Sequence, residues 1–246
     1  MDNAAREREE CETVLKQWAA GLGWPLDRLA MERFEVYART LVAWNERFNL
    51  TRITDLRGIY VKHFADSMAL FMLPEVQSGE RLLDMGSGAG FPGLVLKIAR
   101  PALRVTLCDS LAKRVGFLVE AAAEIGVEAE CVHGRAEDLA RRGAGQRDRF
   151  PVATARAVAP LRVLVEWCMP FVRPGGVFVA MKGRGGAEEL DDARRAIALL
   201  GGEVERVADY DLPLGAGGRV LVVIRKVGET PAGFPRRAGE ASRSPL

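Results

Sequence analysis

Cysteine is scarce in this sequence, and its spacing does not suit metal binding. The four thiols belong to Cys11, Cys108, Cys131 and Cys168, and no C-x-x-C motif occurs among them. Two of the four lie in apolar, strand-like runs. We therefore expect small buried side chains, and we predict neither a metal site nor a disulfide framework.

Long apolar runs are also missing. The longest ones, such as VFVAM and VLVVI, are far shorter than the roughly 20 residues that a membrane-spanning helix needs. The first ten residues, MDNAAREREE, are too charged for a signal peptide. We expect no membrane association and a cytoplasmic location in a reducing compartment.

Neither positively nor negatively charged residues are in large excess. The 35 Lys and Arg residues nearly balance 33 Asp and Glu residues, which leaves a formal net charge of +2. Binding of nucleic acid would therefore depend on a local basic patch. Hydrophobic residues make up 48% and charged residues 28% of the 246, which excludes a wholly disordered or fibrous chain.

The first part of the chain has helical spacing. Residues 4–20, 26–48 and 56–73 carry apolar side chains three or four positions apart, as Tyr60, Phe64 and Met68 do. A polar turn at residues 49–55 separates the second helix from the third. We predict an N-terminal helical lobe over residues 1–74.

After Pro74, short apolar runs alternate with helical patterns, which predicts a mostly parallel sheet with helices on both faces. Only residues 212–218 separate the last two strands, so these two should be antiparallel. The composition of the tail, rich in Pro, Gly, Ser and Arg, predicts mobility. We divide this part into an α/β domain, residues 75–227, and a basic tail, residues 228–246. The expected strands cover residues 81–85, 103–108, 127–133, 152–156, 176–182, 203–210 and 219–226.

A glycine-rich turn is the strongest motif. An apolar strand ends in Asp84 and runs through LLDMGSGAGFPG, residues 82–93, into a helix whose first turn suits Pro92. Gly86 and Gly88 would let a ligand approach the backbone closely. Gly88, Gly90 and Gly93 also satisfy G-x-G-x-x-G, so a dinucleotide remains open. Asp84 instead favours a cationic ligand such as S-adenosylmethionine. The order D-x-G-x-G-x-G, which begins at Asp84, resembles that of class I methyltransferases.

Other candidate side chains follow the strand ends. Asp109 comes about 20 residues after the turn, where an acid accepts ribose hydroxyls, although Asp109 or Ser110 could instead cap the next helix. Arg156 could hold a cofactor or a phosphate, or form a salt bridge with Glu137 or Asp109. Phe91 is poorly placed for a core and could flank a cofactor or a base.

Together these segments resemble the small-subunit ribosomal RNA methyltransferase G family, also called glucose-inhibited division protein B. The resemblance covers about residues 44–246. Its motifs are NLTRI, KHFADS, LLDMGSGAGFPG, LCDSLAKR, the strand end Thr154-Ala155-Arg156-Ala157, MKG, and the tail TPAGFPRRAG with its closing SPL.

The resemblance implies a class I methyltransferase fold, Rossmann-like, and transfer of a methyl group from S-adenosylmethionine to N7 of guanine 527 in 16S rRNA. It also suggests an ordered tail, and it gives Glu137 a role at the adenine edge; taken alone, Glu137 reads as a solvated helix acid. The positions that it implies for cofactor contacts are Gly86, Phe91, Ala136, Glu137 and Arg156.

N7 of guanine needs no deprotonation, so we assign no catalytic base and expect positioning to dominate. Candidate positioning residues are His63, Arg156 and Lys182, although His63 could equally be a satisfied helix residue. Surface cations would contact RNA only if they gather on the strand-end face. The RNA candidates are Arg52, Lys62, Lys182, Arg184, Arg219, Arg236 and Arg237.

Three other functions stay open: a methyltransferase for another RNA, a nicotinamide-dependent oxidoreductase, and a non-catalytic ribosome assembly factor. The expected partner is 16S rRNA or the 30S subunit, and we expect a monomer.

Overall fold

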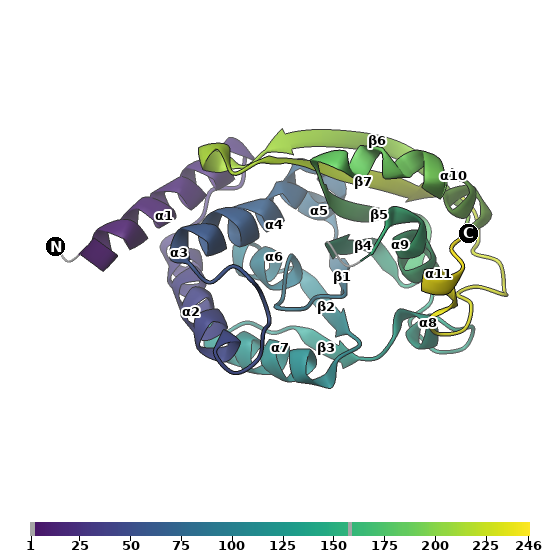
Figure 1. Ribbon diagram of the computed structural model, residues 1–246, viewed down its shortest axis with the longest axis horizontal. Helices are drawn as coiled ribbons and strands as arrows, with labels where there is room; N and C mark the ends of the chain where they lie inside the picture. The colour runs from purple at the N-terminus through teal and green to yellow at the C-terminus, as the bar shows by residue number, and fades with distance from the viewer. Residues whose placement is uncertain (1–2, 157–158) are drawn as a thin grey trace.

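The part of the chain that the structure describes contains one seven-stranded sheet (Figure 1). This computed structural model describes residues 3–156 and 159–246, so Ala157 of the predicted strand-end motif lies outside them. The sheet order is β3-β2-β1-β4-β5-β7-β6. The strands are β1 (Arg81–Met85), β2 (Arg104–Asp109), β3 (Glu130–His133), β4 (Phe150–Arg156), β5 (Val172–Gly183), β6 (Gly202–Asp211) and β7 (Gly218–Lys226).

Neighbouring strands pair in parallel except β7, which runs antiparallel to both β5 and β6. The predicted α/β class and the antiparallel final pair are confirmed. The strand order reverses beside β1, because the chain first moves outward through β2 and β3 and then returns to the other side of β1 with β4. A ligand crevice opens at the carboxyl ends of the strands at such a reversal.

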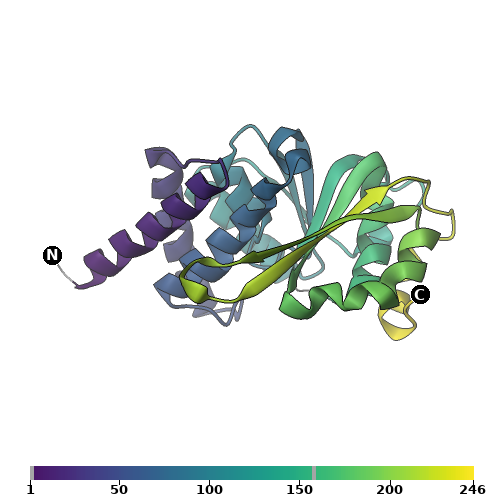
Figure 2. The same ribbon diagram turned by 90° about the horizontal axis from the view of Figure 1, so that it is seen from above.

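Helices cover both faces of the sheet (Figures 1 and 2). One face holds α6 (Gly93–Ala99) and α7 (Ala112–Ile125), and α2 (Arg28–Asn45) packs on both of them. The other face holds α9 (Leu161–Cys168), against which α8 (Ala136–Leu139), α10 (Glu189–Leu199) and α11 (Glu240–Arg243) pack. None of the described helices is long and apolar enough to cross a bilayer.

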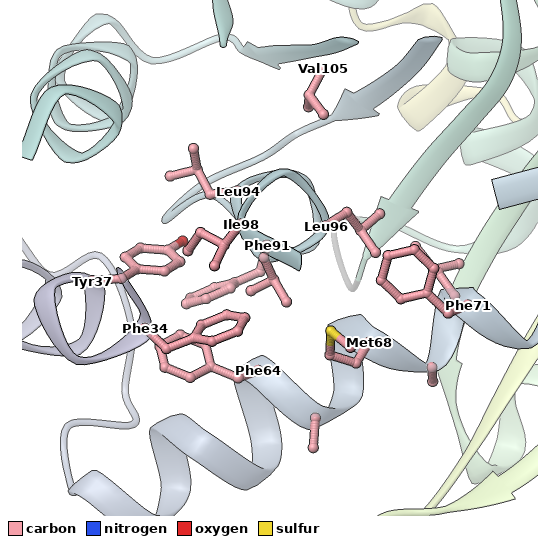
Figure 3. Packing of buried hydrophobic residues seen from close by; sticks show 14 of the residues in the cluster. Phe34, Tyr37, Phe64, Met68, Phe71, Phe91, Leu94, Leu96, Ile98 and Val105 are labelled. Atoms are coloured by element: carbon pink, nitrogen blue, oxygen red, sulfur yellow. The ribbon is translucent and has the colours of Figure 1, made fainter. Parts of the chain in front are cut away.

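The N-terminal helices share a core with the sheet. Alternate strand residues face opposite sides, so Leu82 belongs to the cluster of α6 and α7, whereas Leu83 belongs to that of α9. Phe34 of α2 and Phe64 lie in the same cluster as Leu94 of α6 (Figure 3). The aromatic rings of Phe34 and Phe64 are 4.9 Å apart.

The predicted third helix, residues 56–73, forms but changes its hydrogen-bond pattern along its length. It consists of α3 (Leu56–Gly58), the π-helix η1 (Ile59–Ala65), α4 (Asp66–Met68) and the 3-10 helix η2 (Ala69–Met72). The wider π turn changes the angular spacing of the residues that follow, which a period of 3.6 does not anticipate. Helix α1 (Asn3–Gly21) packs against this π-helix.

Several local boundaries differ from those predicted. Strand β3 starts at Glu130 rather than near Val127, because Gly126 ends α7 in a left-handed conformation and Val127 N donates back to Ala122 O. Pro92 lies just before α6 rather than in its first turn, and the Phe91–Pro92 bond is cis. Short helices that were not predicted are α5 (Pro74–Ser78), η3 (Met169–Phe171), η4 (Arg184–Ala187) and η5 (Pro213–Gly215).

The tail is ordered, so the mobility inferred from its composition is wrong. Arg147 donates to the carbonyl oxygens of Thr230 and Phe234, both at 2.6 Å. Arg236 of the tail pairs with Glu166 of α9, whose side chain is 1% exposed. Charge-assisted hydrogen bonds of this kind hold the tail, together with Phe234 and Leu246, which pack against the cluster of α9.

Replacing Glu166 by Gln should loosen the tail. The guanidinium of Arg236 would lose its carboxylate partner, which costs roughly 2 kcal/mol in a mostly buried pair. Limited trypsin digestion should then cleave after Arg236 and Arg237 faster than in the wild type. Asp191→Asn, which removes an exposed ion pair to Arg194, is the control and should leave the cleavage rate unchanged. Equal cleavage in both variants would contradict the anchoring role.

Candidate functional site

A cavity of about 450 Å³ lies at the carboxyl ends of the central strands. Its walls come from residues 50–53, the π-helix, the glycine turn, and the ends of β4 and β5. A larger cleft of about 570 Å³ around Arg81 and Arg149 lies at the amino ends of the strands, away from the turn. The site residues predicted from the sequence that line the first cavity are Lys62, His63, Gly86, Gly88, Phe91, Arg156, Lys182 and Arg219.

Glycine is required at different positions of the turn for different physical reasons. Gly86 and Gly88 have φ of +72° and +56°. A Cβ on Gly90 would lie 2.5 Å from the Tyr37 hydroxyl, so that glycine allows packing. A Cβ on Gly88 would meet nothing nearer than Gly86 O at 3.8 Å. Gly88 therefore leaves open space above the backbone, as a ligand-binding turn requires.

Asp84 lies behind the turn rather than on the cavity wall. Its side chain is fully buried, and Oδ2 accepts a hydrogen bond from Gly93 N at 2.9 Å, at the start of α6. Oδ1 has no hydrogen-bond partner among the described residues. Burial raises the pKa of Asp84 to about 7, and the Gly93 N–H offsets this in part. The carboxyl is thus tied to α6, not aimed into the cavity as the sequence suggested.

Asp109 fastens the other side of the turn. Its Oδ2 accepts from Gly88 N at 3.0 Å, and its Oδ1 accepts from Leu111 N at 2.9 Å. Helix α7 begins at Ala112 with Leu111 at its N-cap and no side-chain cap, so the predicted capping by Asp109 or Ser110 is wrong. The Asp109 carboxylate instead holds the glycine turn and the residue before the helix. Ser110 is exposed, and its carbonyl oxygen contacts His133 Nε2 at 3.2 Å. Neither Asp109 nor Ser110 is part of the described cavity wall.

Glu137 is buried beneath the tail, which excludes a solvated helix acid. It lies in the first turn of α8, is 3% exposed, and accepts from Gly239 N at 2.9 Å through Oε1. Ala136 beside it is also buried. The tail therefore reaches the position at which the sequence predicts the adenine edge.

Arg156 forms a salt bridge, but not with the predicted acids. Its Nη1 lies 3.1 Å from Asp66 Oδ2, whereas Glu137 and Asp109 have other partners. The guanidinium also lies 4.8 Å above the ring of Phe91. Asp66 comes from α4, about 90 residues earlier in the chain, so only the fold brings the pair together.

His63 connects Arg156 to the loop before the π-helix. Arg156 Nη2 lies 3.2 Å from His63 Nδ1, and His63 Nε2 lies 2.9 Å from Thr51 Oγ1. A guanidinium can only donate, so Nδ1 accepts and the ring proton lies on Nε2. Burial, and then the charge of Arg156, lower the pKa of His63 to about 3. The imidazole is therefore neutral at ordinary pH.

Phe91 belongs to the core, contrary to the expectation that it is poorly placed for one. It is 4% exposed and its ring centroid lies 4.3 Å from that of His63, on which it stacks. It also stacks on Tyr37 at 5.3 Å (Figure 3). Phe91 also lines the cavity, so the same ring packs in the core and forms part of the cavity wall.

The predicted RNA-binding cations fall into separate groups. Lys182 is 8% exposed and its ammonium binds Glu189 at 2.9 Å, while Arg236 is held by Glu166. These two are occupied in holding the structure. Arg219 lines the cavity and pairs with Asp66, and exposed Arg184 pairs with Asp211. The remaining candidates, which are exposed, are Arg52, Lys62 and Arg237.

Sequence reasoning missed three residues of the site. Asp66 and Thr51 lie within the quoted motifs KHFADS and NLTRI, but nothing in the sequence reveals their partners. Tyr210 of β6 donates to Asp66 Oδ1 at 2.8 Å across 144 residues, and no sequence signal marks it. Within residues 3–156 and 159–246, no cluster of three or more His, Cys, Asp or Glu side chains could hold a metal ion.

Comparisons with known proteins show the family of this chain. A family model described as rRNA small subunit methyltransferase G matches residues 30–213. A ribosomal RNA small subunit methyltransferase G of Geobacillus kaustophilus is 44% identical, over 98% of this chain and 99% of its own length. One from Alkaliphilus oremlandii is 41% identical, over 96% and 99%.

Among solved structures, the O-methyltransferase from Bacillus cereus in complex with SAH has the same fold. Its TM-score is 0.55 at 16% identity, over 87% of this chain and all of that one.

Stability should fall in acid because of His63. Between about pH 6.5 and 3, the unfolded chain binds a proton at this residue and the folded protein does not. The contribution of His63 to the free energy of unfolding therefore falls with falling pH, by up to about 1.4 kcal/mol per pH unit. Urea denaturation of His63→Gln should show a shallower acid limb than the wild type.

His133→Gln, at an exposed histidine, serves as the control for this measurement. An unchanged acid limb in His63→Gln would show that the buried imidazole is not the group that resists protonation.

Proposed function

Since this chain belongs to the rRNA small subunit methyltransferase G family, we propose that it transfers a methyl group from S-adenosylmethionine to N7 of guanine 527 in 16S rRNA. One structural observation supports this most: the turn containing Gly88 opens onto a cavity at the strand-order reversal. Class I methyltransferase folds carry the donor at this reversal. The oxidoreductase alternative is discarded, because the family is one of methyltransferases.

The residues present fit S-adenosylmethionine. Gly88 leaves space for a ligand on the backbone. Behind the turn, Asp84 has a pKa of about 7 and an Oδ1 without a partner among the described residues, so a positive charge nearby would favour its ionised form. A donor with ammonium and sulfonium charges suits such a turn, whereas a pyrophosphate does not. The residues that we propose for holding it are Asp84, Gly86, Gly88, Phe91, Asp109, Ser110, Ala136, Glu137 and Arg156.

When bound, S-adenosylmethionine supplies a methyl group on a positively charged sulfur. The residues of the chain have only to orient the base, because N7 of guanine carries a free lone pair. His63 is neutral, and both of its ring nitrogens are already in contact with Thr51 and Arg156. It is therefore suited to holding Arg156 rather than to moving a proton, and rate enhancement would come from placement.

The exposed cations beside the cavity support an RNA substrate. Lys62 and Arg219 line it, and Arg52 and Arg184 directly adjoin lining residues. Phosphate contacts of this kind set the orientation of a nucleic acid. We propose that the substrate is 16S rRNA, either free or within the 30S subunit, and that the enzyme acts as a monomer in the cytoplasm. We further propose that residues 1–74 form its helical lobe, residues 75–227 its catalytic domain and residues 228–246 its tail.

Incubation with labelled S-adenosylmethionine and 30S subunits from a strain that lacks this modification should label 16S rRNA. Mass mapping should place one N7-methylguanosine at position 527. Subunits from the parent strain, whose 16S rRNA is already methylated at this position, are the control and should take up no label. Label at another guanine would identify a different RNA target, and RNA binding without any label would support the assembly-factor alternative.

Gly88→Ala should weaken binding of S-adenosylhomocysteine at least tenfold, because the new methyl group enters the open space above the turn. Gly126→Ala is the matched control, since Gly126 also has positive φ (+72°) and an equally open surrounding but ends α7. Both variants carry similar backbone strain of about 1 kcal/mol. Calorimetry should therefore separate them, and equal affinities would place the ligand elsewhere.

A further inference from the structure

The cleft of about 570 Å³ at the amino ends of the strands is lined by three arginines from neighbouring strands. Arg81 begins β1, Arg149 directly precedes β4, and Arg173 is the second residue of β5. The sheet order places β1, β4 and β5 side by side (Figure 1). Because neighbouring strands lie only about 4.8 Å apart, the sheet brings these three side chains, the cleft arginines, to one place.

A neutral network of charges closes one side of this cleft. The guanidinium of Arg225 lies on the cleft wall and contacts Glu75 at 2.6 Å and Glu205 at 2.9 Å. Arg206 lies 3.7 Å from each of the same two carboxylates. Two positive charges therefore meet two negative ones, and the network leaves the net charge of the cleft unchanged.

The other acids near the cleft have partners elsewhere. Glu80, the remaining acid on the wall, pairs with Arg104 at 2.9 Å. Asp148, which precedes Arg149, lies 3.5 Å from Arg147. Within residues 3–156 and 159–246, none of the cleft arginines has a carboxylate at salt-bridge distance. Three positive charges are therefore left without compensation at one cleft.

Uncharged groups hold two of the cleft arginines in place. The guanidinium of Arg81 lies 5.4 Å from the ring centre of buried Phe150. Nη1 of Arg149 donates to Gly145 O at 3.0 Å and to the Gln146 side chain at 3.2 Å. These contacts orient the two side chains but do not neutralise them. In Arg149 they also leave Nε and Nη2 without an acceptor among the described residues.

Phosphate groups of an RNA strand suit this arrangement. Three like charges around one cleft repel one another, so the cleft gains most from a ligand with several negative charges. Guanidinium groups bind phosphate oxygens through paired N–H donors. Arg149 and Arg173 are exposed and Arg81 is half-buried, so a strand can reach them from outside. The chain belongs to an rRNA methyltransferase family, so its substrate supplies such a strand.

We propose that Arg81, Arg149 and Arg173 bind the phosphate backbone of a second segment of the substrate RNA, at the edge of the sheet opposite the glycine turn. This inference rests on the proposed function. Strand β4 has seven residues, so the two edges lie roughly 20 Å apart. One folded RNA would then contact the protein at the cavity through the target base and at this cleft through its backbone alone. Backbone contacts of this kind fix orientation without reading the base sequence.

The test replaces the three cleft arginines together by Gln and measures binding of unmodified 16S rRNA over a range of salt concentrations. The control variant carries Arg6→Gln, Arg39→Gln and Arg195→Gln, which remove the same charge from exposed positions on α1, α2 and α10. Loss of three phosphate contacts should lower the slope of log K against log salt by about two to three. The Kd at physiological salt should rise at least tenfold, and the control variant should stay close to the wild type.

Two further measurements separate RNA binding from a structural role. The Kd for S-adenosylhomocysteine and the melting temperature should match those of the wild type, because the cleft lies away from the glycine turn. In the methylation assay, the KM for 30S subunits should rise while kcat at saturating subunits stays unchanged. Should the triple variant fail to fold, the three single variants decide, each with a slope lower by about one.

The contrary outcomes are distinct. If the wild type methylates no 16S rRNA, the proposed function fails before the variants are compared. If the wild type is active but both triple variants lose equal affinity, only net charge matters and the inference is wrong. A KM that rises for 30S subunits, with an unchanged Kd for free rRNA, would assign the cleft to an acidic protein surface and overturn it. Binding of inorganic phosphate that the triple variant loses, with RNA affinity unchanged, would show a small-anion site and overturn it too.

Discussion

A mostly parallel sheet places the carboxyl ends of its strands at one edge, and this geometric constraint decides where the site lies. The order reverses beside β1, so the turn that follows β1 and the end of β4 border the same cavity. Parallel strands are buried on both faces, which requires helices on each side. The N-terminal helices take part in that cover and bring the loop of residues 50–53 and the π-helix to the cavity.

Buried carboxylates hold this edge together. Each accepts hydrogen bonds from other groups of the protein, because an unpaired buried charge is costly. Asp84 and Asp109 grip the two ends of the glycine turn, and Asp66 gathers side chains from three strands. Glu137 and Glu166 bind the tail. The cavity is thereby set before any ligand arrives, which suits an enzyme that works by placement.

The chemistry and the electrostatics agree. Attack by N7 of guanine needs no base, and the one histidine at the site is neutral with both nitrogens in contact. The cavity mouth instead carries guanidinium and ammonium groups. Lys182 and Arg236 were also predicted to contact RNA. Their charges are instead paired with Glu189 and Glu166, and these ion pairs stabilise the fold.

Local patterns in the amino-acid sequence were enough to predict most elements of the fold. Apolar periodicity located the helices and strands, short loop length required the antiparallel pair, and the motif order identified the family and the glycine turn. The partners of the site residues emerged from the folded chain: Asp66 for Arg156, the core for Phe91, and the tail for Glu137. These contacts join residues about 90 to 140 positions apart, or depend on how a core fills, and periodicity carries information only about near neighbours.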